Sequence, residues 1–290
     1  MAALMLPLLL VFAALVIDTG FYYVLRRQAQ NGADAAALGA AREIGAKRYA
    51  AANAIVTTLA TTNGVTVTAV TYDPAAAIPS SATRKVTVAT SGSTQAVLAR
   101  LVGQPTLTAN ASATAAIAGL TSYSSTASSP LTRMVPLAVR VDEYTAHPYG
   151  TAAARYDLCL GALVSCAGQT FKFTSFGSAT VPAPDYVSGM SVTTVTVGSI
   201  INLSAGQQAA SMTELGRSTP PRFTGSYWVI PLIDDSAQVV GFSYFFVESV
   251  DASGNGSLLG YFVELGTPTA GPIGAGLGTN YGVYNVALAP

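Results

Sequence analysis

Residues 1–17 read Met-Ala-Ala-Leu-Met-Leu-Pro-Leu-Leu-Leu-Val-Phe-Ala-Ala-Leu-Val-Ile and contain no charged side chain. Asp18 interrupts this run, residues 21–25 restore its apolar character, and two arginines follow at 26–27. An α-helix rises about 1.5 Å per residue, so residues 1–25 would span roughly 37 Å, enough to cross a bilayer core of about 30 Å. The pattern therefore predicts an N-terminal helix of membrane-spanning length.

Three interpretations of the apolar run are open. A cleaved secretory signal needs basic residues ahead of the apolar core and a small-residue cleavage site after it, and this chain has neither around residues 1–23. A plain membrane anchor fits the length. A pilin-type helix lies in the membrane before assembly and packs in a filament core afterwards. It fits the length and also the alanine-rich continuation at residues 28–44.

Asp18 is the unusual residue of this helix, because a carboxylate at the centre of a membrane helix costs roughly 2.5 kcal/mol or more. In one interpretation it lies at the membrane surface with Tyr22 and Tyr23, whose rings favour headgroup depth. In the other it pairs with a cation of a neighbouring subunit, such as Arg26. The candidate residues for membrane insertion and assembly are Leu4, Leu8, Phe12, Leu15, Asp18, Tyr22 and Arg26.

The composition argues for a protein that works outside the cytoplasm and against nucleic acid as a partner. Only 10% of the residues are charged, with 14 Lys and Arg against 14 Asp and Glu, so the formal net charge is zero. Nucleic-acid binding requires clustered basic residues that neutralise phosphates. The mean hydropathy of +0.44 is high, and the abundance of Val and Thr beside Ala is suited to β-structure.

The positions of turn-forming residues along the chain predict an α+β fold in three parts. The first is a hydrophobic and then amphipathic helix over residues 1–60. The second, at 61–120, is a small α+β unit that packs on this helix. The third, at 131–290, is a β-rich outer domain, so the globular region contains one or two antiparallel-sheet units.

Within these parts, alternating residues predict strands at 65–72, 84–90 and 105–117, and residues 93–102 predict a short helix that ends at Gly103. Three closely spaced strands follow in the outer domain, and they include the single tryptophan, Trp228. We expect this meander to form the core of the outer domain. Its strands are predicted at 226–233, 239–249 and 257–264.

The two cysteines, Cys159 and Cys166, match no common zinc signature, and the single histidine, His147, cannot complete a metal site with them. They are either a pair of buried thiols or a disulfide that closes a small loop, and an extracytoplasmic location favours the disulfide. Such a loop would contribute about 2–3 kcal/mol. Candidate glycosylation sites are Asn110, Asn202 and Asn255.

Nothing in the sequence predicts catalysis. A Gly-x-Ser-x-Gly elbow is absent, and the glycine-rich tail at 271–278 lacks the Lys-Ser/Thr ending of a phosphate-binding loop. The acidic pairs Asp142-Glu143 and Asp234-Asp235 are typical of solvated turns. We therefore expect no enzymatic activity, no cofactor and no bound metal.

Two motifs near the N-terminus resemble the TadE/TadG-like proteins of tight-adherence (Flp) pilus systems. The first is an Asp-x-Gly step after the apolar run, here Asp18-Thr-Gly20. The second is the segment Tyr-Val-Leu-Arg-Arg-Gln-Ala-Gln-Asn-Gly-Ala-Asp-Ala-Ala-Ala at residues 23–37. The resemblance covers about 45 residues, and weaker similarities to the family occur at residues 113–115 and 135–139. It implies a membrane-inserted, outward-facing protein associated with a pilus.

The function expected from these observations is that of a structural subunit of an extracellular pilus-like filament, which polymerises through its N-terminal helix. The alternative is a membrane-anchored pilus-assembly or adhesion factor that is not the main fibre subunit. In either case the protein would be inserted in the cytoplasmic membrane before assembly and would meet the pilus-assembly machinery. The filament hypothesis predicts continuous helix over residues 1–60, and the anchored factor predicts a break near Gly32 or Gly45.

Overall fold

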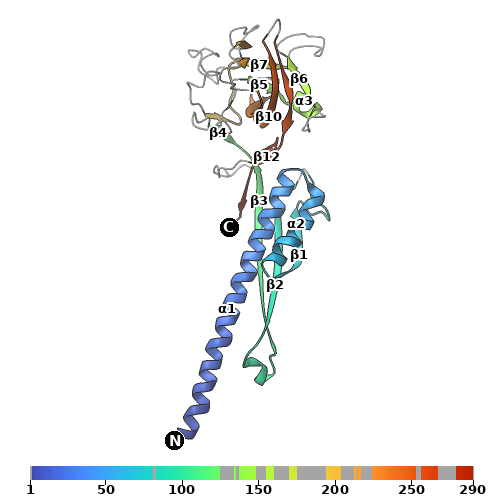
Figure 1. Cartoon of the computed structure of the whole chain (residues 1–290). Helices are drawn as coiled ribbons and strands as arrows, with labels where there is room; N and C mark the ends of the chain where they lie inside the picture. Colours follow the sequence, from blue (N-terminus) through green and yellow to red (C-terminus); the bar gives the residue numbers. More distant parts are fainter. Residues whose placement is uncertain are drawn as a thin grey trace. The chain divides into compact units, whose positions relative to one another are not determined.

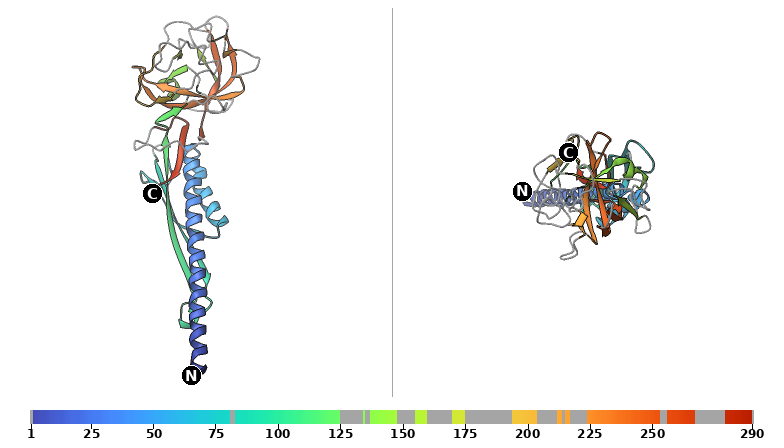
Figure 2. Two further views of the ribbon diagram at one scale, coloured as in Figure 1. Left: turned by 90° about the vertical axis from the view of Figure 1, so that its left-hand side faces the viewer. Right: turned by 90° about the horizontal axis from the view of Figure 1, so that it is seen from above.

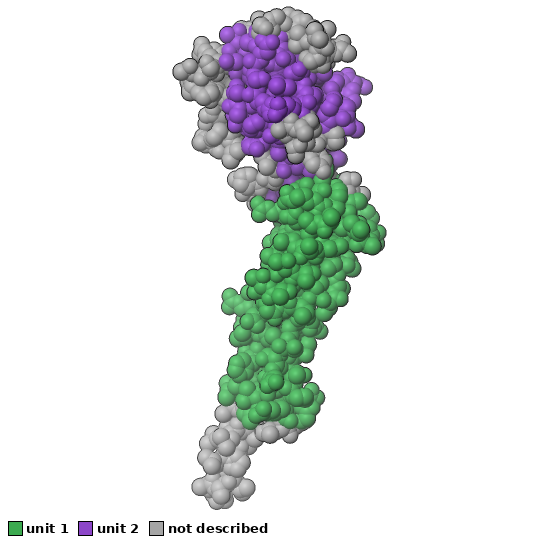
Figure 3. Space-filling model, turned by 45° about the vertical axis from the view of Figure 1, so that its right-hand side comes forward, with its two compact units in different colours: residues 1–117, 286–290 green, residues 118–285 purple. Residues whose placement is uncertain are grey.

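The computed structural model divides the chain into two compact units (Figure 3). Unit 1 comprises Met1–Ile117 and Val286–Pro290, and unit 2 comprises Ala118–Asn285. Side chains at 2–15, 101–102 and 265–266 are left out of the description. The residues that the structure describes are 2–80, 83–124, 134, 137–147, 155–159, 170–174, 194–203, 212–213, 215–216, 224–252, 256–266 and 279–289.

Unit 1 begins with two helices, α1 (Ala2–Gly45) and α2 (Tyr49–Thr62), rather than one. The expectation of a continuous helix over residues 1–60 is therefore wrong. The Lys47 amide donates to Ile44 O at 2.9 Å and the Arg48 amide to Glu43 O at 2.9 Å, while Lys47 adopts a left-handed φ of 54°. This is a Schellman arrangement, which satisfies the last carbonyls of a helix and ends it.

An antiparallel sheet follows the helices in unit 1 (Figure 1). Its strands are β1 (Thr66–Asp73), β2 (Lys85–Gln95) and β3 (Thr106–Gly119), in the order β1-β2-β3, as the alternating sequence predicts. The C-terminal strand β13 (Val283–Leu288) is next in the sheet order, and the Ala289 amide donates to Thr114 O at 2.8 Å. The end of the chain thus returns to unit 1.

Between β2 and β3 the chain makes a long hairpin whose tip contains the 3-10 helix η1 (Ala99–Val102). The helix expected over residues 93–102 is wrong in its first part, because β2 pairs with β3 as far as Gln95, opposite Thr106. Cross-strand pairing thus overrides the weak helical preference of residues 93–95. Gly103 ends η1 in the left-handed conformation, with φ of 86°, as expected for a C-cap glycine.

The second half of α1 is buried by its own chain, because the sheet lies against it (Figure 2) and α2 packs on it as well. Two α1 glycines leave no space for a Cβ: on Gly32 it would collide with Val65, just before β1, and on Gly39 with Leu59 of α2. Small residues thus permit close approach from two sides. The fully buried small residues of α1 are Ala29, Ala33, Ala36, Ala37, Ala40 and Ala41.

Unit 2 is built on a six-stranded sheet in the order β6-β11-β10-β9-β5-β7. Its centre is the predicted meander of β9 (Ser226–Ile233), β10 (Val239–Asp251) and β11 (Ser257–Val263), which is antiparallel. The remaining strands are β5 (Leu137–Arg140), β6 (Tyr156–Cys159) and β7 (Phe171–Phe173). β5 runs parallel to β9 and antiparallel to β7.

Both faces of this sheet are buried, so β9 reads as a continuous apolar run rather than an alternating one. One face carries Trp228 and Phe245, and Tyr144 of α3 (Val141–Ala146) packs against it. The other face carries Phe242, and it is covered by a two-stranded sheet of β4 (Ser122–Ser124) and β8 (Thr194–Thr196). The short strand β12 (Leu265–Gly266) pairs with the start of β13. Trp228 thus lies in the core, as predicted.

The left-handed Lys47 gives a test of the helical hairpin. A left-handed conformation costs an L-residue with a side chain roughly 1–2 kcal/mol, and glycine escapes most of this cost. We expect Lys47→Gly to raise the free energy of unfolding by about 1 kcal/mol relative to Lys47→Ala, which removes the same side-chain atoms but keeps a Cβ. Urea unfolding followed by circular dichroism measures the difference. In a continuous helix the order would be reversed, since glycine is about 1 kcal/mol worse than alanine there.

Candidate functional site

The candidate site is the part of α1 where burial by unit 1 begins. Leu25 is the first apolar α1 side chain after Asp18 that the sheet covers, and a Cβ on Gly92 of β2 would collide with it. One turn further on, the Thr90 hydroxyl donates to Ala29 O at 2.8 Å, and both residues are buried. From Leu25 onward α1 is thus a packed element of unit 1.

Asp18 makes the earliest described contact between α1 and the rest of unit 1. Its carboxylate accepts three backbone hydrogen bonds from the tip of the β2–β3 hairpin: from Val97 N at 2.8 Å, Leu98 N at 3.1 Å and Ala99 N at 2.7 Å. The Asp18 residue is only 7% exposed. The carboxylate satisfies amides that open η1, which would otherwise lack partners within this short helix.

The geometry of Asp18 ties two distant parts of unit 1 together. Three amide N–H groups from consecutive residues converge on the two carboxylate oxygens. Hydrogen bonds to a carboxylate are stronger than those between neutral groups. The contact therefore fixes the hairpin tip to α1.

Neither interpretation of Asp18 from the sequence includes this contact. One placed the carboxylate at a membrane surface and the other paired it with a cation of a neighbouring subunit, whereas the structure gives it three amides of its own chain. The residues that sequence reasoning missed are those of the hairpin tip. Residues 93–102 gave only a weak helix signal, and contact between residues about 80 positions apart is invisible to local patterns.

The other candidate residues on α1 have two different outcomes. Leu4, Leu8, Phe12 and Leu15 lie within α1, but their side chains are outside the described part of the chain. Tyr22 and Arg26 are exposed, and Tyr22 belongs to a set of apolar and aromatic side chains that unit 1 leaves uncovered. We call this set the collar, and it comprises Val16, Ile17, Phe21, Tyr22, Tyr23 and Val24.

The collar surrounds α1 instead of forming a stripe. Successive helical residues turn by about 100°, so six collar positions within nine residues point in all directions around the axis. Exposure reaches 71% at Val16 and 69% at Tyr23. Only Asp18 and Leu25, seven residues apart and hence on one face, are buried by unit 1 in this stretch. No helix qualifies as a membrane span by its length and apolar character among the residues that could be assessed.

The cysteines and sequons are only partly described. Cys159 is buried in β6, whereas Cys166 lies outside the described residues, so the disulfide stays a prediction. Asn110 lies exposed on β3 opposite Ser91, and Asn202 is exposed beyond β8. Asn255 lies outside the described residues. His147 is exposed and stacks on Tyr156 with ring centroids 4.1 Å apart.

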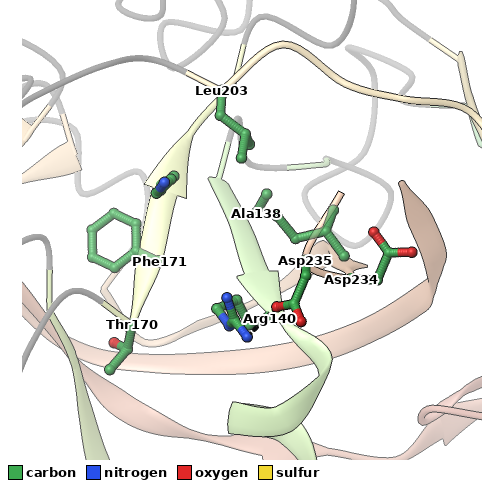
Figure 4. A pocket seen from close by; sticks show the side chains of 9 residues that line it. Ala138, Arg140, Thr170, Phe171, Leu203, Asp234 and Asp235 are labelled. Atoms are coloured by element: carbon green, nitrogen blue, oxygen red, sulfur yellow. Dashed lines mark ion pairs between the residues drawn. The ribbon is translucent and has the colours of Figure 1, made fainter. Parts of the chain in front are cut away.

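Unit 2 contains a shallow pocket of about 70 Å³ between β5, β7 and the end of β9 (Figure 4). Three of its charged groups are partnered within unit 2. Arg140 pairs with Asp235 at the pocket and with Asp142 at 3.1 Å. Asp234 accepts bonds from Ser236 and Gln238 within the β9–β10 turn. Lys172 of β7 also lines the pocket. In the described ranges no three potential metal ligands lie close enough to hold an ion.

The architecture of unit 1 defines a class of protein. An N-terminal helix is buried on an antiparallel sheet in its second half, and its uncharged, apolar start at residues 2–17 precedes the contact with the sheet (Figure 1). The unit is thus an α+β unit built around one long N-terminal helix.

Residues 1–43 match a family described as putative Flp pilus-assembly TadE/G-like, so the resemblance drawn from the motifs is confirmed for this segment. The match connects the N-terminal helix with Flp pilus assembly and does not distinguish a fibre subunit from an assembly factor. No curated protein and no solved structure matches the chain.

The Asp18 contact predicts a local effect of charge removal. Asp18→Asn keeps the side-chain shape but replaces one acceptor oxygen by a donor, which faces the amides of Val97–Ala99. We expect hydrogen–deuterium exchange at residues 96–102 to accelerate in this variant. Asp34→Asn is the matched control, because Asp34 accepts an i,i+4 bond from the Gln30 side chain on α1 itself and should leave the tip unchanged. Equal protection of the tip in wild type and Asp18→Asn would contradict the assignment.

The predicted disulfide can be tested by thiol chemistry. Alkylation of the denatured, unreduced protein should leave Cys159 and Cys166 unmodified, whereas alkylation after reduction should modify both, as measured by intact mass. We expect the double variant Cys159→Ser, Cys166→Ser to lose about 2–3 kcal/mol of stability. Alkylation of both residues without reductant would show free thiols instead.

Proposed function

We propose that this protein is a membrane-anchored component of a Flp-type pilus system, acting as an assembly or adhesion factor. The proposal rests on how the surroundings of α1 change along its length. Its apolar start is followed by the exposed collar, and the same helix becomes a buried element of unit 1 from Leu25 onward. The apolar start serves as the anchor, and units 1 and 2 lie outside the membrane at the cell surface.

The helix break at Gly45 supports an anchored factor over a filament subunit. The filament hypothesis predicted one helix over residues 1–60, and the chain instead folds α2 back onto α1. The sheet and α2 occupy the surface of α1 between Ala29 and Ala41, so this stretch has little surface left for bundling with copies of itself.

A second candidate function is the main subunit of the filament, polymerising with itself. The exposed collar favours it, because a bundle of α1 helices from several copies would cover apolar side chains on every side of each helix. In this case only residues before Leu25 would form the filament core.

For either function we propose a structural role without catalysis, cofactor or metal. At the unit 2 pocket, Arg140 pairs with Asp142 and Asp235, which is consistent with a structural surface. The partners would be the pilus-assembly machinery and the membrane, and the zero net charge argues against nucleic acid.

Fractionation of producing cells distinguishes the two functions. Sheared fibres and membranes are separated, and each fraction is analysed by mass spectrometry and negative-stain electron microscopy. An anchored factor stays in the membrane fraction while another protein forms the fibres; a fibre subunit dominates the sheared fraction. Leu8→Arg, which costs roughly 2.5–3.5 kcal/mol at the centre of a membrane helix, should release the protein from membranes, and Leu8→Ile should not. Retention of Leu8→Arg in the membrane would contradict the anchor.

A further inference from the structure

The tip of the β2–β3 hairpin lies toward the N-terminal end of α1 within unit 1, as both views show (Figure 1 and Figure 2). The Asp18 carboxylate holds it there through the amides of Val97–Ala99. The opposite end of the same sheet holds the β1–β2 connection, since Asp73 pairs with Lys85. The hairpin tip therefore lies at the end of unit 1 from which the apolar residues 2–17 of α1 extend.

The sequence of this tip is unusual for an exposed hairpin end. Residues 96–102 read Ala-Val-Leu-Ala-Arg-Leu-Val and contain a single charge, Arg100. Val97 is 40% exposed, Leu98 is half-buried, and Arg100 is exposed. Hairpin ends in water are normally rich in Gly, Asn, Asp and Ser. An apolar tip with one arginine has instead the composition of a segment that lies at a membrane surface.

The collar on α1 indicates what covers the tip. Val16, Ile17 and Phe21 lie within one turn of Asp18 and are exposed, on faces of the helix that the hairpin does not occupy. A single protein partner would cover one face of α1, whereas a bilayer covers all of them. The residues that follow along α1 are Tyr22 and Tyr23 and then Arg26 and Arg27, which is the aromatic and basic order expected at a headgroup layer.

We propose that the tip of the β2–β3 hairpin is a second contact with the lipid bilayer, in which Val97 enters the headgroup region and Arg100 meets anionic lipid headgroups. This inference rests on the proposed insertion of α1. The Asp18 carboxylate and the three amides satisfy each other, so these backbone donors are already paired where the tip meets the membrane surface. Asp18 thus sets the position along α1 at which unit 1 rests on the bilayer.

Fluorescence quenching by lipids tests this contact in the full chain. Val97→Trp places an indole at the tip, and the protein is bound to phosphatidylcholine vesicles with bromine near the headgroup end of the acyl chains. The wild type provides the blank, because its single Trp228 is buried in unit 2 at 2% exposure. Ile78→Trp is the matched control, since Ile78 is 63% exposed in the β1–β2 connection, at the opposite end of the sheet.

We expect the emission added by Val97→Trp to shift to the blue and to be quenched, and the emission added by Ile78→Trp to stay unquenched. If the protein floats with the vesicles but Val97→Trp is not quenched, the tip contact is wrong while the anchor stands. If the protein does not bind vesicles, both proposals fail. A blue shift without vesicles that grows with protein concentration would show that a second copy covers the tip, which also overturns the proposal.

The role of Arg100 has its own readout. One basic residue at an anionic surface strengthens binding about fivefold. Arg100→Gln should therefore weaken partitioning onto vesicles that contain phosphatidylglycerol by about fivefold and leave partitioning onto pure phosphatidylcholine unchanged. Lys85→Gln, an exposed basic residue at the opposite end of β2, is the control and should change neither value. An equal loss for both variants would reflect net charge alone and would contradict a site at the tip.

Discussion

The fold of unit 1 depends on how closely other elements approach α1 between Leu25 and Gly45. The short alanine side chains keep the helix thin. At Gly32 and Gly39 the absence of a Cβ lets the chain at the start of β1 and a side chain of α2 contact the helix directly. Each alanine buries little apolar area, so the stability of this packing comes from many short contacts rather than from large side chains. Larger residues would separate the layers, which accounts for the run of small residues in this part of α1.

Regular elements were predictable from the sequence, and their interruptions were not. Strands β1, β2 and β3 and the meander around Trp228 follow from alternation and from apolar runs bounded by turns. The end of α1 at Gly45 was expected only under the anchored-factor alternative, because its left-handed residue is Lys47 rather than glycine and the usual stop signal is absent. The tip of the β2–β3 hairpin was misread because its strand pairing is specified by β3, about ten residues further along the chain.

The candidate site was recognised in its position but not in its partners. A carboxylate inside an apolar helix is a strong sequence signal, and Asp18 was correctly singled out as the unusual residue of this helix. The partners are backbone amides, which every residue carries, so no side-chain pattern could identify them. The exposure of the collar could not be predicted either, since Leu25 is buried and Val24 is exposed although both are aliphatic residues.

The path of the chain between the units has a consequence for how such a protein can vary. The chain leaves unit 1 after Ile117 and returns with Val286, so all of unit 2 is inserted between two strands that follow each other in the sheet order, β3 and β13. Insertion between sheet strands leaves the helix, the hairpin and their contacts intact whatever the insert contains. Unit 1 can therefore serve as a constant carrier, and surface domains of unrelated sequence can be exchanged at this position without redesign of the part that holds α1.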